Sequence, residues 1–395
     1  MKILFSIPSL YGGGAEKVIK YLIENIQSNE KFLCTLEAGQ KYDLEKNIKY
    51  IKLTNIDGRA NTFKKITFFF IQYIKFIFLI SKEKPDIIIS FLERSNIITI
   101  LTPIKTKKVI SIRSFISKKF EDTGIKGKIV KFFYKFLFKR VNNFVVPTYE
   151  IKEDLIKNFK INRDNIKVIY NPIDLEKIDN LKNENLESEY FDLFKTNKIL
   201  INVGNLTYPK GQWHLIKIFS KLKQKNNIKL VILGEGSYLD FLVKFALKLH
   251  MKVYDYTRSK ILDNSYDIYF LGFKKNPYKF LYNSDIFIFS SLREGFPNAL
   301  IEAMACELPV VSTNCLSGPK EILDNGKYGI LLPVFSGNKN DYDLDETENK
   351  WIKVINSLLK QDLGMYKKLS IKRVREYELN RIIKVWEKYI KEQLK

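Results

Sequence analysis

The amino-acid sequence predicts an α/β protein with two parallel-sheet domains, and three observations support this. The chain has 395 residues, which at roughly 150 residues per domain suggests two or three domains. Hydrophobic residues make up 45% of it, enough to fill a large core. Short apolar runs alternate with helical patterns along both halves, which is typical of parallel sheets covered by helices on both faces.

Five buried strands are expected in each half of the chain. In the first half they lie at residues 2–7, 87–91, 109–112, 143–146 and 168–170. In the second half they lie at residues 199–203, 229–233, 267–271, 286–289 and 310–312. Helices fill the intervals, and residues 251–266 have the character of a local insertion.

These elements group into four segments. We expect an N-terminal domain over residues 1–175, a polar linker over 176–198 and a C-terminal domain over 199–375. A basic helix over 376–395 is expected to pack back on the N-terminal domain. Two Rossmann-like halves that face each other across a cleft offer a ligand site at the carboxyl ends of their strands.

The net charge and the small numbers of cysteine and histidine limit the possible classes of function. Lysine and arginine outnumber aspartate and glutamate by 67 to 44, a net charge of +23. This favours an anionic partner, although AT-biased coding explains a surplus of lysine equally well. Three widely spaced cysteines and two histidines argue against a disulfide framework and a His-rich zinc site, so a reducing cytosol is the default. The first strand follows Met1 directly, without the pattern of a signal peptide.

Two apolar, basic helical segments occupy residues 66–80 and 127–140. The first is too short and too polar for a transmembrane span. One third of its helical circumference collects Lys64, Lys65, Gln72, Lys75 and Lys82, and the second segment has a stripe of Lys128, Lys131, Lys135 and Lys139. Two interpretations stay open. The helices either cover the sheet with a wet polar edge, or hold the protein peripherally on an anionic membrane surface, the inner face of the cell membrane.

A glycine-rich loop follows the first strand. Gly13 and Gly14 stand between that strand and a helix from about Ala15, so backbone amides can approach an anion there. The loop matches neither G-x-G-x-x-G nor G-x-x-x-x-G-K-[ST]. Nicotinamide cofactors and P-loop chemistry are therefore disfavoured.

Loops after the strands of the second half carry further candidates. Asn205 and Lys210 follow the strand at 199–203, and a lysine at a carboxyl strand end can pair with a phosphate. A solvated loop lysine is the plainer interpretation of Lys210 taken alone. Gly234 and Gly236 follow the next strand and permit another close backbone approach.

The segment 290–303 is the densest candidate. Pro297 suits the first position of a helix, and the free amides beyond it form an anion cradle. Glu294 precedes this helix and Glu302 lies inside it, so both can point into one cleft at different depths. Two carboxylates suit the recognition of sugar hydroxyls, because each accepts two or more hydrogen bonds.

In this combination and order, the motifs resemble the retaining family-4 glycosyltransferases of the GT-B fold. The matching pieces are G-G-A-E at 13–16, V-G-x-L-x-x-x-K-G at 203–211, G-E-G at 234–236, L-G-F at 271–273, E-G-F-P-x-x-L-x-E-A at 294–303 and S-G-P-x-E-I-L at 317–323. They span nearly the whole chain. The segment I-S-F-L-E-R at 89–94 is similar to bacterial enzymes that extend undecaprenyl-diphosphate-linked glycans, including N-acetylgalactosaminyltransferases.

The resemblance implies a role for each matched position. Lys210 would hold the donor diphosphate, Glu294 the donor sugar and Glu302 the ribose. Backbone amides around residues 295–300 would cradle a phosphate, and Gly295, Phe296, Pro297, Asn298 and Leu300 are donor-binding positions of that segment, where Pro297 contributes shape and no N–H. Phe273 and its neighbours would hold the base, and Gly13 and Gly14 would complete the site. It implies a nucleotide-sugar donor, for which we expect a UDP-hexose or UDP-N-acetylhexosamine, a lipid-linked glycan acceptor, and neither cofactor nor metal.

Two positions depart from the family pattern. Asn205 stands where the family often has arginine, so the diphosphate loses a bidentate partner. Arg113 stands near the place where many members carry a histidine. A protein base is then less favoured, and the departing phosphate can accept the proton of the acceptor. Glu93, Arg94 and Arg113 are the candidates on the acceptor side.

Two other functions were weighed against sugar transfer. A nucleotide-sugar epimerase of the same fold needs acid and base groups on both faces of the sugar, and no histidine lies near the motifs. A nucleic-acid-binding protein is disfavoured because the basic residues are spread along the chain and form no known module. We therefore expect no nucleic-acid partner.

Overall fold

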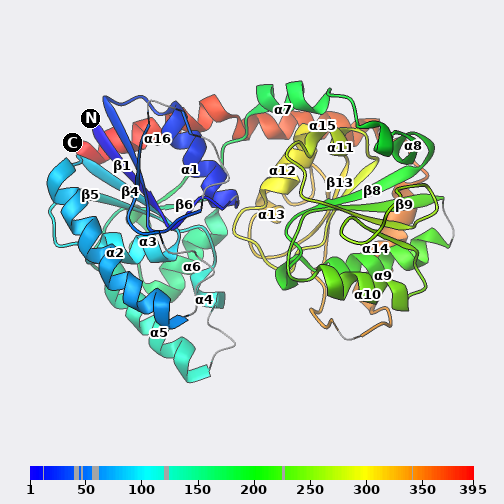
Figure 1. The fold of residues 1–395 in the computed structure, drawn as a ribbon, viewed down its shortest axis with the longest axis horizontal. Coiled ribbons are helices and arrows are strands. Elements are labelled where there is room, and N and C mark those ends of the chain that lie inside the picture. The colour runs from blue at the N-terminus through cyan, green and yellow to red at the C-terminus, as the bar shows by residue number, and fades with distance from the viewer. Residues whose placement is uncertain are drawn as a thin grey trace. The chain divides into compact units, whose positions relative to one another are not determined.

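The computed structural model describes residues 1–11, 13–39, 44–45, 48–55, 62–119, 124–224, 227–339 and 341–395. The side chains of residues 62–66, 119, 125 and 126 lie outside this description, and with them Lys64 and Lys65 of the expected polar edge. The described chain divides into two compact units (Figure 1). Unit 1 comprises Met1–Pro172 and Leu379–Lys395, and unit 2 comprises Ile173–Glu378.

Unit 1 is built on seven parallel strands in the order β3-β2-β1-β4-β5-β6-β7. The strands are β1 (Lys2–Ile7), β2 (Glu30–Thr35), β3 (Lys49–Lys52), β4 (Ile87–Phe91), β5 (Lys107–Ser111), β6 (Phe144–Val146) and β7 (Ile166–Val168). The helices are α1 (Gly14–Asn25), α2 (Thr62–Glu83), α3 (Glu93–Leu101), α4 (Ile116–Lys119), α5 (Gly124–Phe138), α6 (Tyr149–Phe159) and α16 (Leu379–Leu394).

Helices cover both faces of this sheet. On one face α1 and α16 pack on alternate strand residues such as Phe5, Ile89 and Val145. On the other face, α2 packs on residues such as Leu4 and Ile88, and α5 and α6 pack on the β5–β6 end. This two-sided burial explains why β1 and β4 are apolar almost throughout.

Unit 2 repeats the architecture with seven parallel strands in the order β10-β11-β9-β8-β12-β13-β14. The strands are β8 (Lys198–Val203), β9 (Ile228–Leu233), β10 (Val253–Asp255), β11 (Ile268–Gly272), β12 (Ile286–Phe289), β13 (Val310–Thr313) and β14 (Ile330–Leu332). The helices are α7 (Leu175–Lys182), α8 (Ser188–Thr196), α9 (Gln212–Lys223), α10 (Leu239–Lys248), α11 (Tyr278–Tyr282), α12 (Asn298–Ala305), α13 (Pro319–Ile322), α14 (Glu346–Leu358) and α15 (Gly364–Val374). Short 3-10 turns lie at Arg163–Asn165, Tyr208–Lys210 and Arg375–Tyr377. The predicted pair of parallel-sheet domains is confirmed.

The polar stretch 176–198 differs from the expected linker. It forms α7 and α8, both part of unit 2. Asp174 caps α7 by accepting the amide of Lys177, and α8 buries Tyr190, Leu193 and Phe194. One narrow buried face is enough to hold an otherwise charged helix, and such a face gives only a weak pattern in the sequence.

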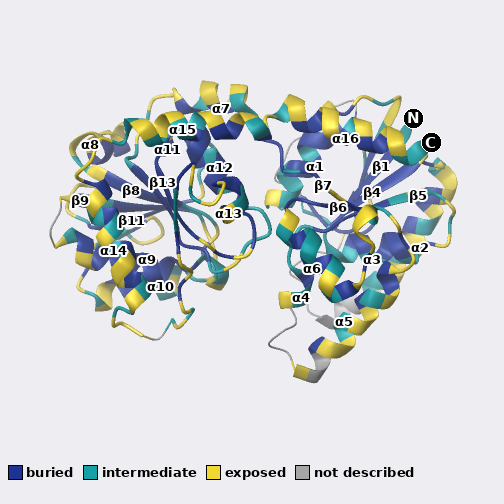
Figure 2. Cartoon of the chain, turned by 180° about the vertical axis from the view of Figure 1, so that it is seen from behind, coloured by how far each residue is buried: buried dark blue, intermediate teal, exposed yellow. Residues whose placement is uncertain are grey.

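Two other segments are also described more closely by the structure. The expected insertion 251–266 contributes β10, which pairs in parallel with β11 at the edge of the sheet. The terminal helix α16 belongs to unit 1, where it lies beside α1 (Figure 2). Its residues Trp386 and Ile390 are fully buried in the core that α1 shares.

The expected wet polar edge of α2 is present at Lys75 and Lys82, which are exposed, but it does not include Gln72. Gln72 is completely buried and hydrogen-bonded, whereas Phe70, Ile74 and Phe78 are exposed. Among the described residues, no helix has the length and apolar character needed to cross a membrane.

Candidate functional site

The strand order of unit 2 defines where a ligand would bind. The chain runs from β8 to β9 on one side, and returns to the other side of β8 as β12. In parallel α/β sheets, ligands bind beyond the carboxyl ends of the strands at such a switch point. The loops that follow β8 and β12 are therefore the first place to examine, and they carry Lys210 and Glu294.

These two loops approach each other closely. Gly211 has φ +61°, and a Cβ atom there would lie 2.4 Å from the carbonyl oxygen of Ser290. Glycine is therefore required both by the backbone angle and by the contact. The Ser290 hydroxyl also donates to the carbonyl of Lys210 at 2.9 Å, so the loop after β12 holds the loop after β8 in place.

Lys210 and Glu294 form an ion pair at this contact. Lys210 Nζ lies 2.6 Å from Glu294 Oε1, and the Ser291 hydroxyl donates to the same oxygen at 2.7 Å. The side chains are 27% and 12% exposed, so both heads remain accessible from solvent. The structure thus brings together the two residues with the central predicted roles. Ser291 is an additional partner that the sequence analysis did not assign.

The Glu294 loop is also held from its other side. Residues Leu316–Gly318 run beside it, and the Ser317 amide donates to the Glu294 carbonyl at 3.1 Å. The Ser317 hydroxyl donates to the carbonyl of Gly295 at 2.6 Å. A Cβ atom at Gly318, where φ is +102°, would lie 2.5 Å from Cδ of Pro297. The S-G-P motif at 317–319 therefore supports the Glu294 loop, a role that its spacing did not reveal.

The start of α12 differs from the expected geometry. Pro297 precedes the helix as its N-cap, with the helix beginning at Asn298 and not at the proline. The amides of Asn298 and Leu300 donate to the carbonyls of Phe296 and Pro297, each at 3.0 Å. These two amides are thus used within the turn, which reduces what the expected phosphate cradle can offer. Glu302 lies half-buried on α12, one turn further along.

The loops after β8, β9 and β11 interlock at the same edge. A Cβ at Gly234, where φ is +142°, would lie 2.0 Å from the carbonyl oxygen of Gly204, and one at Gly236 would lie 2.2 Å from that of Leu206. Asn205 is exposed between them. Beyond β11, the ring of Phe273 is 56% exposed, so a flat apolar surface is available at this edge.

The predicted residues of unit 1 lie at the carboxyl edge of its own sheet. Gly13 is the N-cap of α1, and Gly14 is its first residue. A Cβ at Gly13 would lie 2.3 Å from Glu16 Oε2, so the Glu16 carboxylate folds back over the glycine loop. Burial raises the pKa of this carboxyl group. The carboxylate of Glu16, which belongs to the G-G-A-E motif, therefore lies against Gly13, and the motif alone gave it no role.

The acceptor-side candidates have partners within unit 1. Arg94 makes two hydrogen bonds, of 2.9 and 2.8 Å, to the buried carboxylate of Glu37, which follows β2. Arg113 donates to the side chain of Asn171, and burial lowers the pKa of its guanidinium to about 9. Glu93 lies in the first turn of α3. Glu37 and Asn171 could not be paired with these arginines from their places in the sequence.

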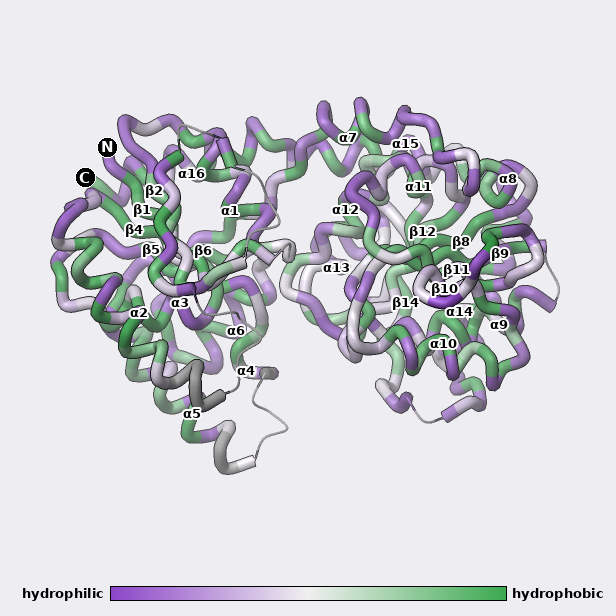
Figure 3. Tube along the Cα trace, in the orientation of Figure 1, coloured by the Kyte–Doolittle hydropathy of each residue, from purple (hydrophilic) through white to green (hydrophobic). Residues whose placement is uncertain are grey.

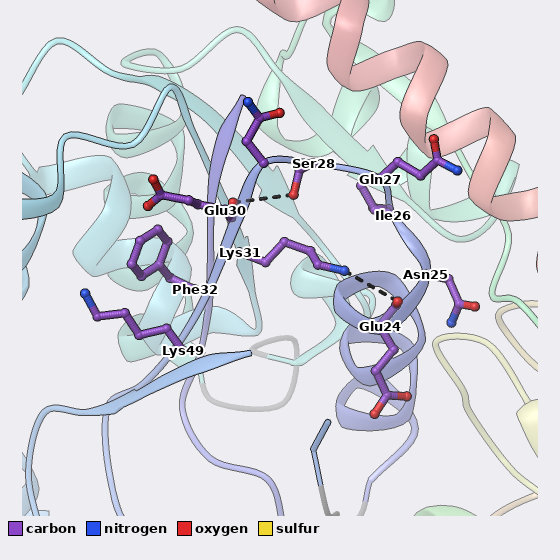
Figure 4. A pocket seen from close by; sticks show the side chains of 10 residues that line it. Glu24, Asn25, Ile26, Gln27, Ser28, Glu30, Lys31, Phe32 and Lys49 are labelled. Atoms are coloured by element: carbon purple, nitrogen blue, oxygen red, sulfur yellow. Dashed lines mark hydrogen bonds between the residues drawn. The ribbon is translucent and has the colours of Figure 1, made fainter. Parts of the chain in front are cut away.

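A groove elsewhere in unit 1 holds none of the predicted residues (Figure 4). It is lined by residues 24–32 and Lys49, at the amino end of β2. Ligands of parallel sheets bind at the opposite, carboxyl edge. Among the described residues, no group of three or more His, Cys, Asp or Glu side chains is arranged to hold a metal ion.

Comparisons with known proteins agree with this architecture. The whole chain superposes on a glycosyltransferase from Rickettsia africae with a TM-score of 0.71 and 19% identity, covering 100% of this chain and 99% of that one. Anabaena HepE in complex with UDP gives a TM-score of 0.75 at 16% identity, covering 99% and 100%. The fold is GT-B, with two α/β domains each built on a parallel sheet.

Sequence relatives define the family. Residues 12–177 match the model "Glycosyltransferase Family 4", and residues 184–353 match "Glycosyl transferases group 1". An uncharacterized glycosyltransferase of Methanocaldococcus jannaschii is 33% identical over 79% of this chain and 80% of its own length. The N-acetylgalactosamine-N,N'-diacetylbacillosaminyl-diphospho-undecaprenol 4-alpha-N-acetylgalactosaminyltransferase of Campylobacter jejuni is 30% identical over 85% and 87%. The chain belongs to this glycosyltransferase family, and the resemblance inferred from its motifs is confirmed.

Proposed function

We propose that this glycosyltransferase moves a sugar, with retention of anomeric configuration, from a nucleotide donor to a hydroxyl of a lipid-diphosphate-linked glycan. The observation that carries the proposal is the Lys210–Glu294 pair at the switch point of unit 2. The donor we favour is a UDP-hexose or UDP-N-acetylhexosamine, and the product belongs to a cell-surface polysaccharide or a glycoprotein glycan. The named activity of the Campylobacter relative and the UDP complex of HepE support this choice.

The site offers one cation and two carboxylates to such a donor. Lys210 pairs with the diphosphate, because an ammonium group is a strong point-charge partner for phosphate. Glu294 accepts hydrogen bonds from the donor sugar, and Glu302 accepts those of the ribose. Phe273 provides an apolar surface for the base. Backbone amides around residues 295–300 add hydrogen bonds to the phosphates, and we assign Gly13 and Gly14 of unit 1 to the donor as well.

The reaction follows from these positions. The bond between the anomeric carbon and the phosphate oxygen breaks, and a bond to the acceptor oxygen forms on the same face. Lys210 stabilises the negative charge that develops on the leaving diphosphate. The departing phosphate oxygen takes the proton of the acceptor hydroxyl, so no protein base is required. Neither a metal ion nor a cofactor takes part in the proposed reaction.

On the acceptor side we assign Glu93, Arg94 and Arg113 to the glycan or its diphosphate. The guanidinium of Arg113 remains protonated at neutral pH, since its lowered pKa of about 9 is still above 7. The acceptor is membrane-bound, and we place the enzyme in the cytoplasm, peripherally on the inner face of the cell membrane.

A donor panel tests the proposal. Binding of UDP-, GDP- and ADP-sugars is measured by the thermal shift of the purified protein, and the best donor is incubated with a lipid-diphosphate glycan acceptor. We expect UDP-sugars to stabilise the protein and the acceptor to gain one α-linked sugar. A free nucleotide-sugar epimerised without transfer would identify an epimerase instead, and stabilisation by nucleic acid alone would identify a binding protein.

A further inference from the structure

The helix α2 carries apolar residues on its outer side as well as on the side that packs in the core, where Phe76, Leu79 and Ile80 are buried. Gln72, in the middle of the helix, is fully buried and donates to the Leu36 carbonyl at 3.0 Å and to the Thr54 hydroxyl at 3.1 Å. The ammonium group of Lys75 donates to the carbonyl of Leu53 at 2.9 Å. Gln72 and the ammonium group of Lys75 are therefore bonded within unit 1, while Lys82 on the same side of the helix is exposed.

A separate row of apolar residues on α2 faces outward. Phe70, Ile74 and Phe78 are spaced four residues apart and lie on one side of the helix, with 61%, 66% and 70% of their surface exposed. An exposed large apolar residue is ordinary when it stands alone, but a continuous row of them marks an interaction surface.

The helix α5 presents a second row of the same kind. Ile129, Phe132 and Phe136 are 63%, 74% and 55% exposed, while Tyr134 and Phe138 on the opposite side are buried in the core. Exposed residues run along both helices in Figure 2, and both are mainly hydrophobic in Figure 3.

Both helices lie on the same face of the sheet of unit 1, against α3. The hydroxyl of Tyr73 on α2 donates to the Leu101 carbonyl at the end of α3, and Ile98 of α3 packs in the α2 cluster. On the other side of α3, Ile100 packs with Tyr134 of α5. We name the six outward residues the apolar face: Phe70, Ile74, Phe78, Ile129, Phe132 and Phe136.

The charged residues around the apolar face indicate which kind of partner it binds. Residues 62–82 and 124–140 contain no aspartate or glutamate, and their charged side chains are all lysine or arginine. Lys82, Lys128, Lys139 and Arg140 are exposed. Two copies of this surface would repel each other, whereas a bilayer with anionic headgroups satisfies both the apolar side chains and the cations.

We propose that the apolar face inserts into the headgroup boundary of an anionic lipid bilayer, with the flanking cations on the lipid phosphates. This inference goes beyond the proposed reaction and depends on neither the donor site nor its residues. Insertion is shallow, since an amphipathic surface enters the interface by about 5–10 Å and does not span it. Unit 1 is then the part of the enzyme that contacts the membrane.

Co-sedimentation with vesicles of phosphatidylglycerol and phosphatidylethanolamine tests the inference. The wild-type protein should bind increasingly as the anionic fraction rises, and less as salt rises. Replacing Phe78 and Phe132 with serine should weaken binding by roughly tenfold for each ring lost. The variant with Lys128 and Lys139 changed to glutamate should bind weakly and lose most of its salt dependence.

Matched control variants distinguish insertion of the apolar face from nonspecific hydrophobic binding to the vesicles. Phe191→Ser and Leu247→Ser remove large apolar residues of unit 2 that are also more than half exposed, at 51% and 54%, and should leave vesicle binding unchanged. Melting temperatures of all variants verify that they fold, which is expected because the changed residues are exposed. Wild-type protein that stays in the supernatant at low salt overturns the inference. So does a wild-type dimer in analytical ultracentrifugation that the Phe78 and Phe132 changes convert to monomer. A missing UDP response in a protein that still binds vesicles would affect the proposed function alone.

Discussion

Lys210 and Glu294 should respond in opposite directions when nucleotide binding is measured. In the free protein the two heads lie 2.6 Å apart, so a diphosphate must compete with Glu294 for the lysine. Removing the lysine removes a charge-assisted contact worth about 1.5–3 kcal/mol, or roughly 10–100-fold in UDP affinity. Removing the carboxylate charge frees the lysine and eliminates repulsion of the phosphates.

The expected magnitude of the second effect is smaller. Both side chains are partly exposed, at 27% and 12%, so solvent screens their attraction and the pair is worth about 1 kcal/mol. Glu294→Gln should therefore bind UDP a few-fold more tightly than the wild type. The same variant should turn over a UDP-sugar far more slowly, because it loses the acceptor for the sugar hydroxyls.

Isothermal titration with UDP and steady-state kinetics on the same protein samples measure the two effects. Lys210→Met keeps the length of the side chain and is the preferred lysine variant. Lys327→Met is a matched control, since this exposed lysine lies before β14, at the opposite end of the strands. Weaker UDP binding by Glu294→Gln together with unchanged binding by Lys210→Met would refute the assignment of the lysine to the diphosphate.

Three further outcomes are expected. Glu302→Gln should mainly raise the donor KM, since the ribose is remote from the bond that breaks; a selective loss of kcat would contradict this. The buried Glu348 accepts from His214 at 2.5 Å and pairs with Lys217 at 2.8 Å, and although burial opposes it, these bonds lower its pKa. Glu348→Gln should thus reduce the melting temperature by about 10 °C at pH 7. The difference between variant and wild type should shrink as pH falls below about 4.5, because there the carboxyl group of the unfolded chain binds a proton more readily than that of the folded chain. A difference that stays constant with pH would argue against this role of Glu348. Transfer should persist in EDTA, and complete loss that Mn²⁺ restores would overturn the metal-independent mechanism.

The alternation of apolar and helical segments predicted the fold class because buried parallel strands such as β4 are apolar on both sides. The strand β3 at the edge of the sheet was not predicted, because the half-buried segment Lys49–Lys52 has few apolar residues. The helices α7 and α8 were not predicted either, because each of them buries only a few residues. A helical wheel shows which residues share a face, but it does not show which face meets the sheet. The sequence therefore could not predict that Gln72 is buried and hydrogen-bonded to Leu36 and Thr54.

The sequence predicts the two central residues of the candidate site, but not the residues that hold their loops in place. Lys210 and Glu294 each follow a strand, so the sheet topology brings them to one edge. Ser291 and Ser317 hold the Glu294 loop through hydrogen bonds whose geometry depends on the path of two loops. Likewise, the pairing of Arg94 with Glu37 joins residues that follow different strands, and no local pattern signals it.

A crystal structure of the protein with UDP tests the central claim most directly. The account predicts the diphosphate beyond the carboxyl ends of β8 and β12, with a phosphate oxygen about 2.7–2.9 Å from Lys210 Nζ. It also predicts that Lys210 leaves its contact with Glu294. UDP bound elsewhere, for example in the groove at residues 24–32, with the Lys210–Glu294 pair intact, would contradict the account.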